Sequence, residues 1–147
     1  MHDFRELGFM VNLVARQLER KMAEALRPHG LNPAYLPVII SLAQDQPQTQ
    51  SELAIALDIR QPTMAQTLGR MELDGLIARA PDPSDRRATA ITLTERTVGL
   101  LETIQGLGSD ILTDALEDIP AERRTQLVED LHTVSRRLAL TDEASGR

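Results

Sequence analysis

The segment QPTMAQTLGRMELD, residues 61 to 74, has the periodicity of a helix with one apolar and one polar side. The apolar side is Met64, Leu68 and Met71. The polar side carries hydroxyls, an amide and a guanidinium, with no carboxylate before Asp74: Thr63, Gln66, Thr67 and Arg70. Such groups form hydrogen bonds with base edges and phosphates, and the major groove of DNA admits a helix. The alternative is an ordinary solvated face, although such a face usually mixes acids with bases.

A small hairpin is predicted directly after this helix, in IARAPDPSDRRATAITLT, residues 77 to 94. Ile91 and Leu93 alternate with Ala90 and Thr92, which is the pattern of a strand with one buried face, and residues 77–80 would be its partner. The connecting loop, PDPSDRR, is too long and too charged for a tight turn. A hairpin beside a helix that can enter the major groove is predicted to be the wing of a winged helix-turn-helix.

The loop of this hairpin supplies cationic side chains. Exposed arginines enter narrow, A·T-rich minor grooves, so Arg86 first and Arg87 second are candidates for such a contact. Asp85 could pair with one of them and brace the loop. The alternative is a surface loop of mixed charge without a binding role.

A second short helix precedes the polar one and completes the helix-turn-helix. Thr49 and Glu52 have the spacing of a capping box at its start. We expect its buried residues to be Leu53, Ala56 and Leu57. Residues 58–60 form a tight connection, Pro62 lies in the first turn of the polar helix, and Gly75 ends that helix.

Longer helices are predicted on both sides of this lobe. A helix from Phe4 to Leu26 has one apolar stripe along its length. The next helix starts after Asn32-Pro33, and Pro37 requires either a kink or a start near Leu36. Its buried side is predicted to be Leu36, Ile39, Ile40 and Leu42.

One long helix is predicted after the hairpin, starting at Thr94, and Pro120 opens a final helix. Gly99, Gly106 and Gly108 each weaken the long helix by up to about 1 kcal/mol relative to alanine. Close packing against a second chain would compensate for that loss. The final helix has Leu127, Leu131, Val134 and Leu138 along one side.

Composition removes several other classes of function. The chain has no cysteine, which excludes disulfides, thiolate metal sites and cysteine nucleophiles. The histidines at positions 2, 29 and 132 are scattered, no glycine-rich phosphate loop occurs, and the acid pairs 117–118 and 129–130 are typical of solvated faces. We therefore expect no enzyme activity, no metal and no cofactor. The absence of a long apolar run or an export signal favours a cytoplasmic protein without a membrane segment.

The net charge of −6 argues against a generally basic nucleic-acid coat protein. Residues 102–147 hold ten acids and five bases, whereas residues 46–101 hold seven acids and six bases. The middle of the chain is therefore free to present its arginines locally.

The order of these elements resembles the MarR family of winged-helix transcriptional regulators. The motifs are TQSELAIAL, QPTMAQTLGRMELDGLIAR and DPSDRRATAITLT, and the last is close to the wing signature of the family. The resemblance implies a homodimer with interlocking terminal helices, a palindromic DNA operator, and a small anionic or phenolic effector that releases the DNA. Three positions depart from the family: Arg60 replaces a common serine cap, Ser84 a common wing arginine, and Thr97 a common glycine.

The sequence thus predicts a mainly α fold with a small β-hairpin wing in a single domain. Residues 33–93 would form the winged helix-turn-helix lobe, residues 1–30 and 95–140 the dimerisation helices, and residues 141–147 a flexible tail. The predicted function is a DNA-binding homodimeric repressor. The predicted DNA contacts are Arg60, Gln61, Pro62, Thr63, Gln66, Thr67, Arg70, Arg86 and Arg87. Arg16 and Arg20 are candidates for binding an anionic effector. The alternative function is a winged-helix module that binds protein instead of DNA.

Overall fold

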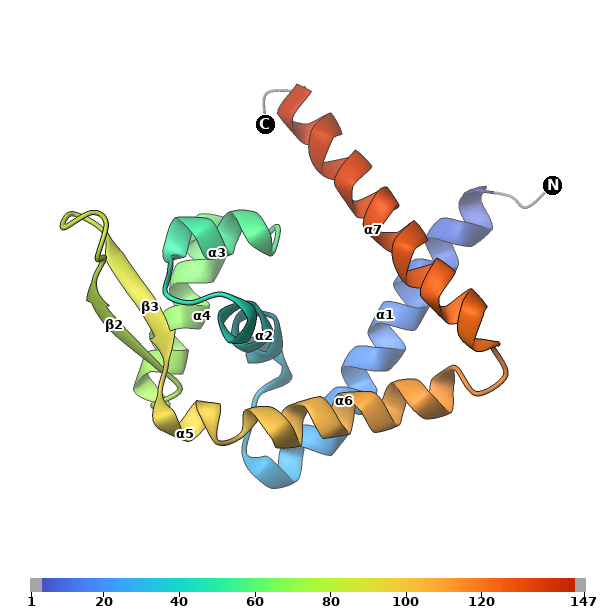
Figure 1. The fold of residues 1–147 in the computed structure, drawn as a ribbon, viewed down its shortest axis with the longest axis horizontal. Coiled ribbons are helices and arrows are strands. Elements are labelled where there is room, and N and C mark those ends of the chain that lie inside the picture. Colours follow the sequence, from blue (N-terminus) through green and yellow to red (C-terminus); the bar gives the residue numbers. More distant parts are fainter. Residues whose placement is uncertain (1–3, 145–147) are drawn as a thin grey trace. The chain divides into compact units, whose positions relative to one another are not determined.

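The computed structural model of the 147-residue chain describes residues 4–144, and Figure 1 shows its elements coloured along the sequence. The fold is mainly helical with one three-stranded antiparallel sheet, as the sequence predicted. The chain divides into two compact units, residues 1–109 and residues 110–147. Each is described by itself below.

Helix α1 spans Phe4–Leu26, the range predicted from its apolar stripe. It passes into the short 3-10 helix η1 (Arg27–His29), and Gly30 ends this segment in the left-handed region at φ 66°. That backbone conformation favours glycine, which lacks a Cβ atom. Leu26 is the residue of α1 that the core buries completely, whereas Phe4 at the other end is 89% exposed.

Helix α2 (Leu36–Gln44) follows a 3-10 turn, η2 (Pro33–Tyr35). The Asn32 side chain accepts a hydrogen bond from the amide of Ala34 and so caps η2. Pro37 lies in the first turn of α2, where its missing N–H has no partner to lose, so the predicted start near Leu36 is confirmed. The prediction for Ile40 is wrong: it is 49% exposed, and Val38 is buried instead.

Helices α3 (Gln50–Ala56) and α4 (Gln61–Leu73) form the helix-turn-helix. Thr49 and Glu52 make both hydrogen bonds of the predicted capping box, which satisfies two backbone amides at the start of α3. The prediction that Ala56 is buried is wrong, since Ala54 takes the position that faces the core.

The sheet contains the predicted hairpin and one additional strand. Strands β2 (Ile77–Pro81) and β3 (Thr89–Leu93) pair with Ile77 opposite Leu93, and β1 (Gln48–Thr49) pairs along the other edge of β3. The order is β1-β3-β2. Ala90, predicted to lie on the outer face, is buried at 2% exposure, and it is paired with Thr49 of β1 on one side and Ala80 of β2 on the other.

The helix predicted after the hairpin is divided in two. Thr94 caps the four-residue helix α5 (Glu95–Val98), and Gly99 ends it before α6 (Leu101–Ala115) begins. In the second unit, α7 (Ala121–Ala144) starts directly after Pro120, as predicted. It continues through residues 141–144 of the segment predicted to be a flexible tail, which corrects that prediction there, and residues 145–147 lie outside the described part.

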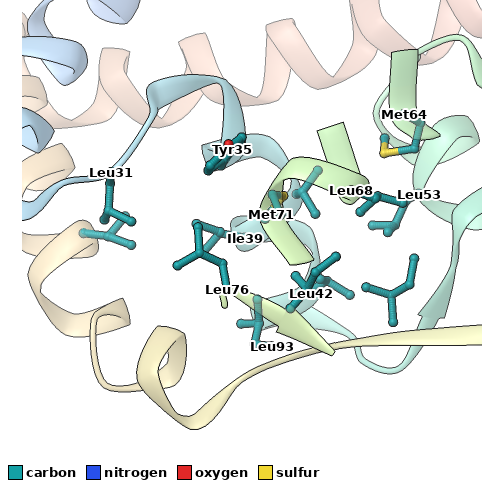
Figure 2. Packing of buried hydrophobic residues seen from close by; sticks show 14 of the residues in the cluster. Leu31, Tyr35, Ile39, Leu42, Leu53, Met64, Leu68, Met71, Leu76 and Leu93 are labelled. Carbon is teal, nitrogen blue, oxygen red and sulfur yellow. The ribbon is translucent and has the colours of Figure 1, made fainter. Parts of the chain in front are cut away.

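The core of the first unit lies beneath the helix-turn-helix (Figure 2). Met64, Leu68 and Met71 of α4 are completely buried, as their spacing predicted. They belong to one cluster with side chains from α2, α3 and the sheet, among them Ile39, Leu42, Leu53, Ile91 and Leu93. Because one side of α4 is fixed in this core, its opposite side is held towards solvent.

Candidate nucleic-acid interface

The outward side of α4 carries the polar residues identified in the sequence. Thr63, Gln66 and Arg70 are at least partly exposed, and Thr67 is half-buried. Arg60 is the N-cap residue of the helix, but its side chain makes no capping hydrogen bond, so its guanidinium is not used to close the helix start. The first turn contains no acidic residue, which leaves the positive end of the helix dipole uncompensated by a side chain. This surface is suited to an anionic partner.

A network of side chains joins the beginnings of the two helices. The Gln50 Nε2 donates to Gln61 Oε1 over 3.1 Å, and Gln61 Nε2 donates to Ser51 Oγ over 3.0 Å. All three side chains are at or near the surface. Gln61, a predicted contact, is thus held by two residues of α3 that the sequence reasoning did not identify. Polar groups at successive helix starts are typical of backbone contacts to DNA.

The loop of the hairpin is organised by aspartates that accept hydrogen bonds from its backbone. The Asp82 carboxylate accepts from both the amide and the hydroxyl of Ser84, at 2.8 and 2.7 Å, and Asp85 accepts from the Arg87 amide at 2.9 Å. Hydrogen bonds from Ser84 lower the pKa of Asp82, because they stabilise its charged form. Ser84, a departure from the family pattern, therefore has a role within the loop.

The arginines at the tip of the loop are left exposed. Arg86 and Arg87 are both exposed, and within residues 4–144 no ion pair joins Asp85 to either of them. Asp85 thus braces the loop through a backbone amide, whereas an ion pair with an arginine side chain was expected. Both guanidinium groups remain available to an external anion.

An ion pair connects the hairpin to α4. The Nε of Arg79 on β2 donates to Glu72 Oε2 over 2.6 Å. This pair gives Glu72, the acid nearest in sequence to Arg70, a cationic partner on β2. The sequence contained both residues, but their contact depends on how β2 packs beside α4 and could not be found from spacing alone.

The turn after α4 has partners on two sides. The Tyr35 hydroxyl donates to Asp74 Oδ2 over 2.8 Å, while the Arg96 Nη1 donates to the Asp74 carbonyl, also over 2.8 Å. The pKa of the Tyr35 phenol is raised above its usual 10.0. The larger cause is burial, and the hydrogen bond with Asp74 is the second. The position at which α4 ends is therefore coupled to both η2 and α5.

A cavity of about 530 Å³ lies between α1 and the segment η2–α2. Its lining is largely apolar: Leu18, Glu19, Met22, Asn32, Pro33, Ala34, Leu36, Pro37 and Ile40. Arg16 and Arg20, the predicted effector contacts, do not line it. The Nη1 of Arg20 lies 3.7 Å from the Oε1 of Glu24 on the same helix. The charged residue in the lining is the carboxylate Glu19.

Within the part of the chain that the structure describes there is neither a metal-binding cluster nor a membrane-spanning helix. Among the side chains that the structure describes, those of residues 4–141, no three His, Cys, Asp or Glu are grouped closely enough to hold a metal ion. Among the helices described, none combines the length and the apolar character needed to cross a membrane.

The chain is similar to MarR-type regulators both in sequence and in fold. Residues 31–89 match the model of the MarR family. The structure of the transcriptional repressor CouR bound to a 23-mer DNA duplex is 27% identical, with a TM-score of 0.75 over 88% of this chain and 92% of that one. A mutant of MarR from E. coli, complexed with operator DNA, is 25% identical, with a TM-score of 0.78 over 88% and 93%. The transcriptional regulator SlyA has the same fold, with a TM-score of 0.86 at 18% identity over 95% and 98%.

Proposed function

Because this chain carries a MarR-family domain and has the fold of MarR regulators over most of its length, we propose that it is a sequence-specific DNA-binding repressor. The resemblance predicted from the sequence motifs agrees with the match of residues 31–89 to the MarR family model. We further propose that it acts on DNA in the cytoplasm as a homodimer.

The observation that carries this proposal is the outward side of α4. It presents hydroxyls, amides and a guanidinium to solvent while three fully buried side chains, Met64, Leu68 and Met71, fix the helix from below. Thr63, Gln66, Thr67 and Arg70 would contact bases in the major groove, and Arg60, Gln61 and Pro62 would lie at its edge. Arg86 and Arg87 would enter the adjacent minor groove.

Apolar surface on the terminal helices supports the homodimer. Phe4, Leu7, Val11 and Val14 of α1 are all more than 40% exposed, and so are Leu127, Leu131, Val134 and Leu138 of α7. Stripes of this kind at helical spacing pack against other apolar surface, which in the proposed homodimer belongs to the second copy. Residues 1–30 and 95–140 would form the dimerisation region and residues 33–93 the lobe that binds DNA. Two such lobes would contact successive major grooves about 34–36 Å apart.

The cavity between α1 and η2–α2 is the candidate effector site. It lies at the junction of a proposed dimerisation helix and the lobe, so a bound molecule would alter how they pack. Its apolar lining fits an apolar ligand body, and the Glu19 carboxylate disfavours an anion. We therefore propose a neutral phenolic or similar apolar effector over the anionic type, and we do not assign Arg16 or Arg20 to this cavity.

A winged-helix module that binds protein is the second candidate. Its support is the net charge of −6 together with two apolar residues on the helix-turn-helix, Ile55 at 82% and Leu73 at 88% exposure. Such a module would not bind the duplex at the α4 surface.

The two candidates are separated by selection from random-sequence DNA followed by fluorescence anisotropy titration. A repressor of this type selects a palindrome and binds it more tightly than an unselected duplex, with affinity that falls steeply as salt rises. The double variant Gln66→Ala, Arg70→Ala should lose the preference for the palindrome. Failure to enrich any sequence, or retention of the preference by the double variant, would contradict the proposal.

A further inference from the structure

The turn that ends α4 is held through its own backbone carbonyls. Three consecutive residues, Asp74, Gly75 and Leu76, accept hydrogen bonds from the segment that begins α5. The donors are the Arg96 Nη1, the Thr94 hydroxyl and the Thr97 hydroxyl, at 2.8, 2.8 and 2.7 Å. The Thr94 amide adds a second bond to the Leu76 carbonyl at 3.2 Å.

One contact at this turn, from Thr97 to the Leu76 carbonyl, is buried, and a second, from Tyr35 to Asp74, is part-buried. Thr97 is 0% exposed, and its hydroxyl also lies 3.2 Å from that of Thr94. Tyr35, on the other side of the turn, is 6% exposed and donates to the Asp74 carboxylate. A hydrogen bond that is shielded from water holds its geometry more firmly than one at the surface. Gly75 adopts φ 71°, a left-handed backbone conformation that favours glycine. The path of the turn therefore depends on glycine at this position.

A small rotation of α4 at this turn is amplified along the helix. The reason is that the helix is much longer than the change in distance that a hydrogen bond can absorb. A 13-residue helix measures about 20 Å at about 1.5 Å per residue. A rotation of about 3° at its C-terminal end therefore displaces its N-terminal end by about 1 Å. A displacement of that size is enough to spoil a hydrogen bond to a base edge.

We propose that Tyr35 and Thr97 are positioning residues for DNA recognition, which hold the turn Asp74–Leu76 and thereby fix the orientation of α4. The inference rests on the proposed function. Thr97 connects the turn to α5, which leads directly into α6. Tyr35 connects it to η2, whose residues Pro33 and Ala34 line the cavity described above. A molecule bound in this cavity that displaces η2 would also displace Tyr35, and so would change its hydrogen bond with Asp74.

The test compares specific with non-specific binding, because a residue that only stabilises the fold would not change their ratio. The probes are a palindromic duplex selected by the unaltered protein and a random-sequence duplex of equal length, titrated at a temperature where circular dichroism shows every variant folded. Tyr35→Phe and Thr97→Val each remove one hydroxyl. Thr97→Ser keeps the hydroxyl, and Thr133→Val is the matched control, since the Thr133 hydroxyl donates to the Glu129 carbonyl within α7.

Tyr35→Phe and Thr97→Val should each bind the palindrome about three- to tenfold more weakly, the range expected for one hydrogen bond, with unchanged binding to random DNA. Thr97→Ser should restore most of the affinity, and Thr133→Val should behave as the unaltered protein. Equal weakening on both duplexes, or none, would overturn the positioning role while leaving the proposed function intact. If Thr97→Val does not fold, Tyr35→Phe decides the outcome. Absence of any preference for the palindrome in the unaltered protein would overturn both.

Discussion

Removal of the wing arginine Arg86 should change how the binding of DNA depends on salt. The Arg86 side chain is exposed, and the loop around it is organised by other groups: Asp82 bonds to Ser84, and Asp85 bonds to the Arg87 amide. Arg86→Ala therefore removes a cationic side chain without removing a support of the loop. The folded structure and its thermal stability should be retained.

The magnitude follows from counterion release. Each arginine that neutralises a phosphate contributes about −0.9 to the slope of log affinity against log salt concentration. A homodimer has two wings, so Arg86→Ala should make the slope less steep by about 1.8. Between about 50 and 200 mM salt, the affinity of the unaltered protein should thus fall about tenfold further than that of the variant.

Fluorescence anisotropy titrations in a series of KCl concentrations measure this slope. Arg136→Ala is the matched control: it also removes one arginine per chain, from the side of α7 opposite to its apolar stripe, and the structure places Arg136 beside Thr133. Its slope should equal that of the unaltered protein. An unchanged slope for Arg86→Ala would refute the wing contact, and a loss of folding would show that Arg86 is structural instead.

Four further changes have defined outcomes. Arg70→Ala should weaken binding to the selected palindrome by about 1–3 kcal/mol if the guanidinium contacts a base, and unchanged binding would remove it from the contact surface. Leu131→Glu places a charge on the apolar stripe of α7 and should shift the protein towards monomer in sedimentation equilibrium, whereas an unchanged dimer would exclude that stripe from the interface. Thr49→Ala removes one half of the capping box and should lower the free energy of unfolding by about 1 kcal/mol in urea titrations; no change would mean that water replaces the cap. The folded-state pKa of Tyr35 is raised above 10.0, so its contribution to stability is complete below that pH and is lost as the pH rises above it; Tyr35→Phe should reduce the loss of stability in that range, and identical pH profiles would contradict this.

Local signals in the sequence were sufficient for much of the helical structure. The extent of α1, the capping box at Thr49 and the buried side of α4 depend on residues within a few positions of one another, and all agree with the structure. Periodicity failed in α2, because LPVIISL is apolar almost throughout and does not distinguish Val38 from Ile40. Strand β1 could not be predicted, since its two residues become a strand only by pairing with β3, some forty residues away.

The sequence predicted the exposed residues of the candidate site, and it did not predict the groups that support them. The residues on α4 and in the wing loop were found from their types and order, and whether they contact DNA stays a prediction. The groups that support them were missed. Ser51, Glu72 and Arg96 act through hydrogen bonds with residues 10, 7 and 22 positions away, and only the folded chain brings these pairs together. Asp85 was identified correctly as part of the loop, but its partner is a backbone amide.

The proposed function requires two copies of α4 to enter successive major grooves of one duplex. Dimethyl sulfate footprinting on the selected palindrome can detect this arrangement, because the reagent attacks the N7 atom of guanine in the major groove. We expect two protected patches, related by the two-fold axis of the palindrome and separated by about one helical turn, that both disappear with the variant Gln66→Ala, Arg70→Ala. A single patch, unrelated patches, or the same protection with that variant would contradict it.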